Sequence, residues 1–225
     1  MPRLDDPIHL NMYAGYRREH RWPQGLKRIL LTIKSEVLGK TPRYGVEWGD
    51  VELVPPLKYF RESFLTPYVN PDHVALEIGP GGGRWTQYML GFKKLYLVDY
   101  HQQLLDEIRS SISARNVEFI KNNGCDFPGV CSSSIDFIFS FGVFVHLDIP
   151  IIEGYLNNIR GIAKPGATIV LQYADKTKRM AQINAGFSDT DPDRMRLLAA
   201  SAGYRIVEED TTTLWHSSVI RLTPR

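Results

Sequence analysis

The chain has 225 residues, a formal net charge of +2 and 43% hydrophobic residues. This length allows one well-buried domain with a smaller appendage, and the near-neutral charge gives no overall signature of nucleic-acid or membrane binding. The two cysteines, Cys125 and Cys131, match neither a disulfide framework nor a zinc-binding spacing. The start of the sequence is acidic and interrupted by prolines, unlike a secretory signal, and the most apolar stretch is too short to span a bilayer. We therefore expect a cytoplasmic protein without a transmembrane segment.

Residues 1–72 are expected to form a helical amino-terminal cap or lid. Within residues 25–39, apolar side chains recur at helical spacing, and Gly39 suits the end of that helix. Residues 17–43 hold eight Lys or Arg against two Glu. This charge indicates either the solvated face of a helix packed over the main domain, or a lid whose basic face meets an anionic acceptor or a membrane surface.

Residues 73–225 alternate short apolar runs with amphipathic runs, which predicts a parallel sheet with helices on both faces. The last two strands are joined by only a few residues, so they must be antiparallel to each other. The pattern predicts a Rossmann-like, doubly wound α/β fold with seven strands, of which the last is antiparallel. The expected strands are 74–79, 94–99, 117–121, 135–141, 168–173, 204–210 and 217–223. The expected helices begin near Arg84, after residue 100, near residue 150 and near residue 192.

The stretch ALEIGPGGGRWTQYML, residues 75–90, follows the first strand with a glycine-rich turn. Such a turn brings backbone close to a ligand at the carboxyl end of a parallel strand, because glycine adopts positive φ and carries no Cβ. The dinucleotide fingerprint would require a third glycine where Arg84 stands, and no separate substrate domain follows. A nicotinamide-dependent oxidoreductase is therefore the weaker alternative.

The run E-I-G-P-G-G-G resembles the first motif of class I S-adenosylmethionine-dependent methyltransferases. The resemblance implies S-adenosyl-L-methionine as cofactor, with Glu77 directed, directly or through water, at the ammonium of the methionine part. Asp99 ends the next strand and would accept hydrogen bonds from the ribose hydroxyls, although an NAD site places a carboxylate there too. The candidate cofactor residues of this half are Glu77, Gly79, Pro80, Gly81, Gly82, Gly83, Trp85, Asp99 and Tyr100.

The loop after the third strand, NNGCDF, resembles the adenine loop of the same family, with Asn123 where an aspartate is usual. Asp126 could contact the adenine amine instead, Gly124 and Cys125 could serve through their backbone, or Asp126 could simply cap a turn. The fourth strand leads to Ser140 and Phe141, which the resemblance places beside the sulfonium. Enzymes that methylate exocyclic nitrogens of bases carry Asn or Asp, two prolines and an aromatic residue there, so this chain departs from that subclass.

Methyl transfer to a hydroxyl requires removal of its proton, and histidine is the natural base near neutral pH. His146 follows the fourth strand where an acceptor pocket would open, and His216 begins the last strand near the same rim. Both are candidate catalytic residues, while a capping or core role for His146 remains the alternative. Phe141 and Phe144 could present aromatic faces to the sulfonium, although strand alternation makes at least one a core residue. No His, Cys, Asp and Glu set has metal-ligand spacing, so no metal is expected.

These features favour metal-independent O-methylation of a small-molecule or saccharide hydroxyl, and the segments EWGD and SFGVFVHL resemble bacterial methyltransferases of sugar and natural-product pathways. The long connection at residues 173–193 is expected to be functional. Alternatives are a nucleic-acid methyltransferase that uses the basic segment 17–43, which the lack of a nucleic-acid module disfavours, and a non-catalytic scaffold. A homodimer stays open.

Overall fold

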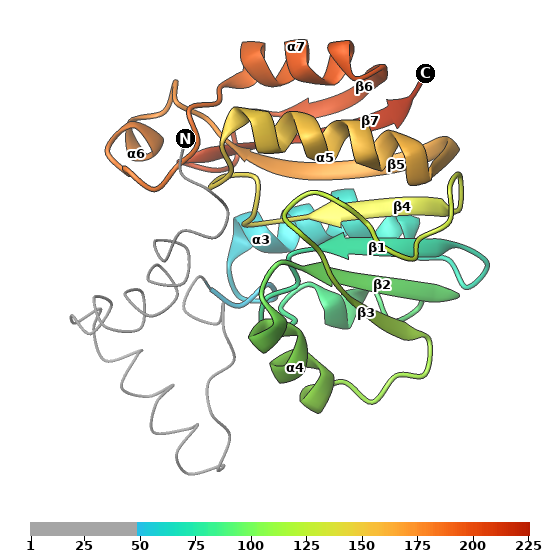
Figure 1. The fold of residues 1–225 in the computed structure, drawn as a ribbon. Helices are drawn as coiled ribbons and strands as arrows, with labels where there is room; N and C mark the ends of the chain where they lie inside the picture. Colours follow the sequence, from blue (N-terminus) through green and yellow to red (C-terminus); the bar gives the residue numbers. More distant parts are fainter. Residues whose placement is uncertain (1–48) are drawn as a thin grey trace. The chain divides into compact units, whose positions relative to one another are not determined.

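The computed structural model describes residues 49–225, which form a seven-stranded mixed sheet flanked by helices (Figure 1). The strand order is β3-β2-β1-β4-β5-β7-β6. The predicted strands are confirmed within a few residues at their ends. They are β1 (Val74–Ile78), β2 (Lys94–Asp99), β3 (Val117–Lys121), β4 (Ile135–Ser140), β5 (Ala163–Ala174), β6 (Tyr204–Asp210) and β7 (Ser217–Pro224).

The strand directions also confirm the expected fold class. Strands β1 to β5 pair in parallel, while β7 pairs antiparallel with both β5 and β6. Strand β7 is therefore the single reversed strand, and it lies between β5 and β6. The carboxyl ends of β1, β2 and β4 meet at one edge of the sheet, where ligands bind in doubly wound folds.

Helices cover both faces of the sheet, as the alternating pattern predicts (Figure 1). One face packs against apolar residues of α5 (Ile149–Ile162) and α7 (Pro192–Ser201). The other face packs against α3 (Pro55–Phe60), the following π-helical turn η2 (Arg61–Leu65) and Ile108 of α4 (Gln102–Ser111). Short turns complete the set: η3 (Thr66–Tyr68), η4 (Thr86–Tyr88) and α6 (Arg179–Gln182).

Two local predictions are wrong. No α-helix begins at Arg84, because glycines with positive φ precede it and a single 3₁₀ turn, η4, already buries Trp85 and Met89 before the chain enters β2. Strand β5 begins at Ala163 and not at residue 168. The segment AKPG, residues 163–166, forms an irregular start of β5 in which the register against β4 shifts and Gly166 has φ +80°.

The expected cap, residues 1–72, lies mostly outside the described residues, as do the amphipathic stretch 25–39 and the basic segment 17–43. Its last part belongs to the described range, and Phe60 and Phe64 are buried in the same apolar cluster as sheet residues. Within residues 49–225, every helix is too short or too polar to cross a bilayer. In that range, no three His, Cys, Asp or Glu side chains are grouped to hold a metal ion, and both cysteines are free thiols.

Candidate functional site

The glycine loop after β1 has the left-handed backbone that its sequence predicts. Gly79, Gly81 and Gly83 have φ of +69°, +53° and +83°, and the Gly79 N–H donates to the Val98 carbonyl at 2.8 Å. A Cβ on Gly79 would overlap Val143 Cγ2, and one on Gly83 would lie 3.0 Å from Ile108 Cδ1. Packing within the chain therefore requires glycine at 79 and 83, in addition to any room that a ligand needs.

Glu77 is the buried carboxylate of this edge. It is 2% exposed, and its Oε2 accepts a hydrogen bond of 2.6 Å from Thr86 Oγ1. Burial raises the pKa of Glu77 to about 8; the negative charge of Asp99 adds to the rise, while the Thr86 bond and the Arg84 charge oppose it. A buried carboxyl of this kind gains most from a cationic partner, so Glu77 is a candidate partner for a ligand ammonium.

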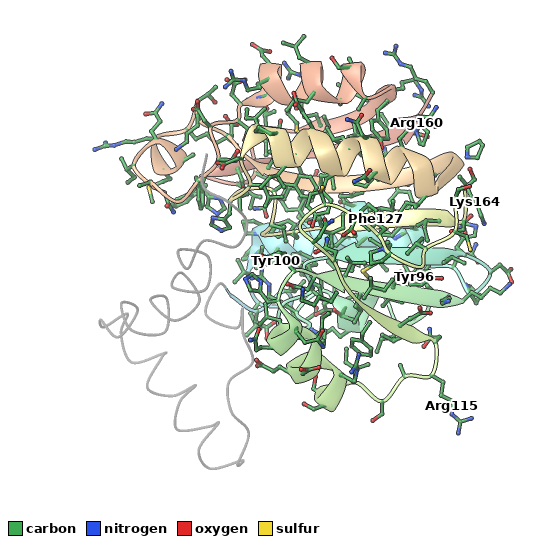
Figure 2. All side chains as sticks on the ribbon, in the orientation of Figure 1. Tyr96, Tyr100, Arg115, Phe127, Arg160 and Lys164 are labelled. Atoms are coloured by element: carbon green, nitrogen blue, oxygen red, sulfur yellow. The ribbon has the colours of Figure 1, made fainter. Side chains whose placement is uncertain are left out.

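Asp99 closes β2 beside the glycine loop and is 7% exposed. Its Oδ1 accepts the His101 N–H at 2.8 Å and lies 3.3 Å from His101 Nδ1, so these contacts fix the carboxylate at the end of β2, where a ribose would bind in the expected site. The Tyr100 ring stands edge-on to His101, with Lys121 Nζ 5.6 Å from the Tyr100 ring centroid. Tyr100 lies at the end of the sheet opposite Lys164 (Figure 2).

Two orphaned polar atoms indicate that this edge accommodates a ligand. Trp85 Nε1 and His101 Nε2 are both buried and have no hydrogen-bond partner among residues 49–225. Buried polar atoms of this kind are usually paired, and in a binding site the ligand is a natural partner. Together with Glu77 and Asp99, these groups fit a nucleoside that carries an amino acid.

The loop after β3 brings the expected adenine residues together around a polar turn. Asp126 Oδ1 accepts the Asn123 N–H at 2.7 Å, and Asn123 Oδ1 accepts the Cys125 N–H at 3.4 Å. One carboxylate oxygen of Asp126 thus caps the turn, which leaves the other for a ligand amine. The neighbouring Asn122 is the buried residue of this loop, and its Nδ2 donates to Tyr155 Oη at 2.9 Å while its Oδ1 accepts the Gly124 N–H.

Ser140, the last residue of β4, and Phe141, which follows it, are both held by contacts within the protein. Ser140 Oγ donates to the Ile78 carbonyl at 3.0 Å, which joins β4 to the end of β1. The Phe141 ring centroid lies 4.6 Å from that of Trp85, so Phe141 forms an aromatic wall with it, while Phe144 is fully buried on the other face. The next N–H, of Gly142, donates to Gln172 Oε1 at 2.7 Å, which fixes the chain where it turns away from the sheet.

His146 and His216 both contact one aromatic ring, that of Phe187. The Phe187 ring centroid is 5.2 Å from the His146 ring and 5.3 Å from the His216 ring, with both imidazoles nearly perpendicular to it. His146 Nδ1 is 2.9 Å from the Gly186 carbonyl oxygen, which can only accept, so Nδ1 carries the proton. In neutral His146, therefore, Nε2 is the unprotonated nitrogen.

Both imidazoles have lowered pKa values. Removal of water by the surrounding protein lowers the pKa of His146 below 6.5, against a smaller opposing effect of the Gly186 carbonyl. The residue as a whole is nevertheless exposed. Burial also lowers the pKa of His216, and the charges of Lys178 and His146 lower it further. Neutral imidazole is the form that accepts a proton, and it predominates for both residues at neutral pH.

The connection between β5 and α7 positions this cluster. Asn184 Oδ1 accepts the Gly186 N–H at 3.0 Å, and the Ser188 N–H donates to the Val145 carbonyl at 2.7 Å. Sequence reasoning marked this connection as functional but singled out none of its residues. It also missed Thr86 and Gln172, because their roles depend on contacts between distant segments, for which the sequence carries no local signal.

The fold is shared with known methyltransferases. A family model described as a methyltransferase domain matches residues 75–166. A SAM-dependent methyltransferase from Aquifex aeolicus is 20% identical with a TM-score of 0.59, and the match covers 78% of this chain and 92% of that one. The CcbJ methyltransferase from Streptomyces caelestis is 16% identical with a TM-score of 0.64, covering 80% and 100%. The magnesium protoporphyrin IX methyltransferase from Synechocystis PCC 6803 is 13% identical with a TM-score of 0.61, covering 85% and 92%.

No curated protein matches the sequence. The domain match over residues 75–166 and the shared fold support the expected class I S-adenosylmethionine-dependent methyltransferase, with S-adenosylmethionine as its cofactor. They favour S-adenosylmethionine over the nicotinamide cofactor, a choice that Asp99 alone left open.

Proposed function

We propose that the enzyme methylates a hydroxyl group of a small molecule or saccharide, with His146 as general base. The observation that carries this proposal is the hydrogen bond from His146 Nδ1 to the Gly186 carbonyl, because it directs a basic Nε2 away from the bond. A thiolate or a neutral amine needs little help from a base, whereas a hydroxyl does. A fixed, neutral imidazole beyond the end of β4 therefore suits an oxygen acceptor best.

In this proposal the residues divide into a cofactor side and an acceptor side. Glu77 would bind the ammonium, Asp99 the ribose hydroxyls and the loop 123–126 the adenine. When bound, S-adenosylmethionine supplies an electrophilic methyl group on a sulfonium. His146 Nε2 takes the proton of the acceptor hydroxyl as its oxygen gains the methyl group, and alignment of the reacting atoms supplies several further kcal/mol, as a rough general estimate.

His216 and Phe187 would complete the acceptor side. The Nδ1 atom of His216 and the Oγ atom of Ser188 are buried and have no partner among residues 49–225, so each could bond a polar group of the acceptor. The Synechocystis neighbour is a magnesium protoporphyrin IX methyltransferase, which illustrates that one fold serves unlike acceptors. The acceptor assignment therefore depends on the histidine pair and not on the fold.

The test is methyl transfer from labelled S-adenosylmethionine to a panel of monosaccharides, phenols and RNA. For a hydroxyl acceptor found in this way, His146→Gln should lower kcat by about 100-fold or more, the usual range for loss of a general base. The affinity for S-adenosylhomocysteine should stay within about twofold. His73→Gln, at an exposed position before β1, is the matched control and should retain wild-type turnover.

The pH dependence of kcat provides a second test of His146 as general base. Because the pKa of His146 is lowered, the acid limb of kcat should lie below pH 6.5 and should be lost in His146→Gln. Near-full turnover of His146→Gln would refute the base assignment and leave the fold and cofactor standing. If only RNA were methylated, with affinity that falls steeply as salt increases, the nucleic-acid alternative would replace this proposal.

A further inference from the structure

The indole N–H of Trp85 is the most deeply buried unpaired donor beside the cofactor edge. Trp85 is 3% exposed, and its Nε1 finds no acceptor within residues 49–225. Its ring packs on Phe139 and Phe141, with centroid distances of 5.3 and 4.6 Å. Because buried indole nitrogens usually have a hydrogen-bond partner, this one calls for an acceptor other than residues 49–225, and a ligand at this edge can supply it.

Trp85 and Glu77 lie on the same face of the sheet. Glu77 of β1 pairs with Phe139 of β4, and Phe139 is one of the rings against which Trp85 packs. Thr86, which donates to the Glu77 carboxylate, directly follows Trp85 in the chain. A group that reaches Glu77 through its ammonium therefore brings its neighbouring atoms close to the indole.

Positive charge lies on the same side. The Arg84 guanidinium carbon is 5.6 Å from the Trp85 ring centroid. Burial raises the pKa of Glu77 to about 8, and the charge of Arg84 opposes this rise, so the guanidinium acts at the Glu77 carboxyl as well. A donor and a cation thus stand beside one buried carboxyl, which is an arrangement that suits a zwitterion.

We propose that Trp85 Nε1–H donates a hydrogen bond to the carboxylate of the methionine part of the cofactor, with Arg84 as the nearby positive charge. The inference rests on the cofactor assignment and on Glu77 as the ammonium site. With this hydrogen bond, Trp85 would favour ligands that carry both the ammonium and the carboxylate of the methionine part over ligands that carry the ammonium alone. The family motif assigns no such role to this indole, which otherwise is only a core aromatic.

The experiment compares two nucleosides by calorimetry. S-adenosylhomocysteine carries both the ammonium and the carboxylate, whereas S-adenosyl-3-thiopropylamine keeps the ammonium and lacks the carboxylate. Trp85→Phe should weaken S-adenosylhomocysteine about tenfold, as expected for loss of a hydrogen bond to a charged group, and should change the affinity for the amine less than twofold. Trp215→Phe, at a side chain that is 79% exposed, is the matched control and should change neither.

A measurement on the wild-type ring keeps the inference testable if Trp85→Phe does not fold. The chain has four tryptophans, and Phe variants at Trp22, Trp48 and Trp215 assign the fourth indole N–H signal by elimination. That signal should move downfield on titration with S-adenosylhomocysteine and move much less with the amine. Equal shifts, or equal losses of affinity for both nucleosides in Trp85→Phe, would overturn the role of Trp85. Failure of wild-type protein to bind either nucleoside would instead overturn the cofactor assignment on which the inference rests.

Discussion

Glu77 combines deep burial with a functional charge, and its protonation links the cofactor site to pH. Its pKa of about 8 means that the carboxyl is mostly neutral at pH 7 in the protein without a bound ammonium, even with the charge of Arg84 acting on it. A bound ammonium stabilises the ionised form, so binding at neutral pH is coupled to release of a proton. We therefore expect Glu77 to lower the stability of the protein without cofactor and to strengthen binding of the cofactor ammonium.

The first prediction concerns the stability of the protein without cofactor. Since the folded-state pKa of Glu77 is raised from 4.5, its favourable contribution is present in full below pH 4.5 and is lost as the pH rises to about 8. Glu77→Gln, which keeps an acceptor for Thr86 but cannot ionise, should flatten this decline between pH 5 and 8. Urea denaturation across that range measures it, with each unit of pKa shift worth about 1.4 kcal/mol.

The same variant should bind S-adenosylhomocysteine more weakly than wild type, most clearly at pH 8. A variant with wild-type affinity and an unchanged stability profile would show that Glu77 has neither the raised pKa nor the ammonium contact. Asp72→Asn, at an exposed position before β1, provides the control for loss of one carboxylate.

At the scale of elements, the candidate site is formed largely by two loops that contact each other. The glycine loop after β1 and the segment after β4 meet where Gly79 approaches Val143, and Val143 in turn accepts the His146 N–H through its carbonyl at 2.9 Å. The cofactor loop and the segment that holds the candidate base are therefore packed as one unit. Residues 175–191 then fix the base from the outer side through Gly186.

A double-mutant series tests the contact between these loops. Gly79→Ala combines positive φ with overlap on Val143, and we expect a loss of about 3 kcal/mol in the free energy of unfolding. Gly129→Ala has φ +80° with nothing within 4 Å of the new Cβ, so it should cost only about 1 kcal/mol. Adding Val143→Ala to Gly79→Ala should recover part of the loss. Equal losses for Gly79→Ala and Gly129→Ala would exclude the clash as a cause.

The turn at Asn184 should set the protonation pattern of His146. Asn184→Ala removes the acceptor for the Gly186 N–H, so the Gly186 carbonyl loses its fixed position opposite His146 Nδ1. Nitrogen NMR of the imidazole should report the Nδ1–H form in wild type and a mixture of both forms in Asn184→Ala. Asp189→Asn, whose side chain is 86% exposed on the same connection, should leave the spectrum unchanged. A wild-type ring protonated on Nε2 would contradict the assignment.

The elements also show what sequence patterns could and could not predict. Most strand positions, the reversed last strand and the glycine loop were predicted, because strand periodicity and short connections are local properties. Glu77 and Asp99 lie at strand ends as expected, and their contacts with the cofactor stay predictions. The 3₁₀ turn after Trp85 was missed because a helical pattern too short for an α-helix still looks amphipathic. Phe187, Gly186 and Thr86 were missed because only tertiary contacts bring them to the site.

At the scale of the described molecule, a group of stabilising polar contacts lies at the end of the sheet opposite the candidate cofactor site. Lys164 lies at the far end from Tyr100 (Figure 2), and its Nζ is 2.8 Å from both carboxylate oxygens of Asp136. Asp136 Oδ2 also accepts the Val74 N–H at 2.8 Å, which joins the starts of β1, β4 and β5. Neither contact involves the cofactor edge.

Asp136→Asn should therefore reduce stability without affecting binding. Burial alone would raise the pKa of Asp136, but Lys164 and the Val74 N–H outweigh it and lower the pKa. The stabilisation is present above pH 3.8 and is lost as the pH falls through the lowered pKa. We expect a loss of about 1 kcal/mol at pH 7, a modest value because Lys164 is partly exposed, and unchanged affinity for S-adenosylhomocysteine. A change in that affinity would show that the two ends are coupled.

The close approach of Gly79 to Val143 has an evolutionary consequence. Any larger residue at position 79 must be accompanied by a change at position 143, so we expect the two positions to be inherited as a pair. The connection at residues 175–191 bears no such constraint toward the cofactor loop. In the proposed function this connection borders the acceptor, so we expect it to differ among relatives with unlike acceptors, while positions 79 and 143 change only together.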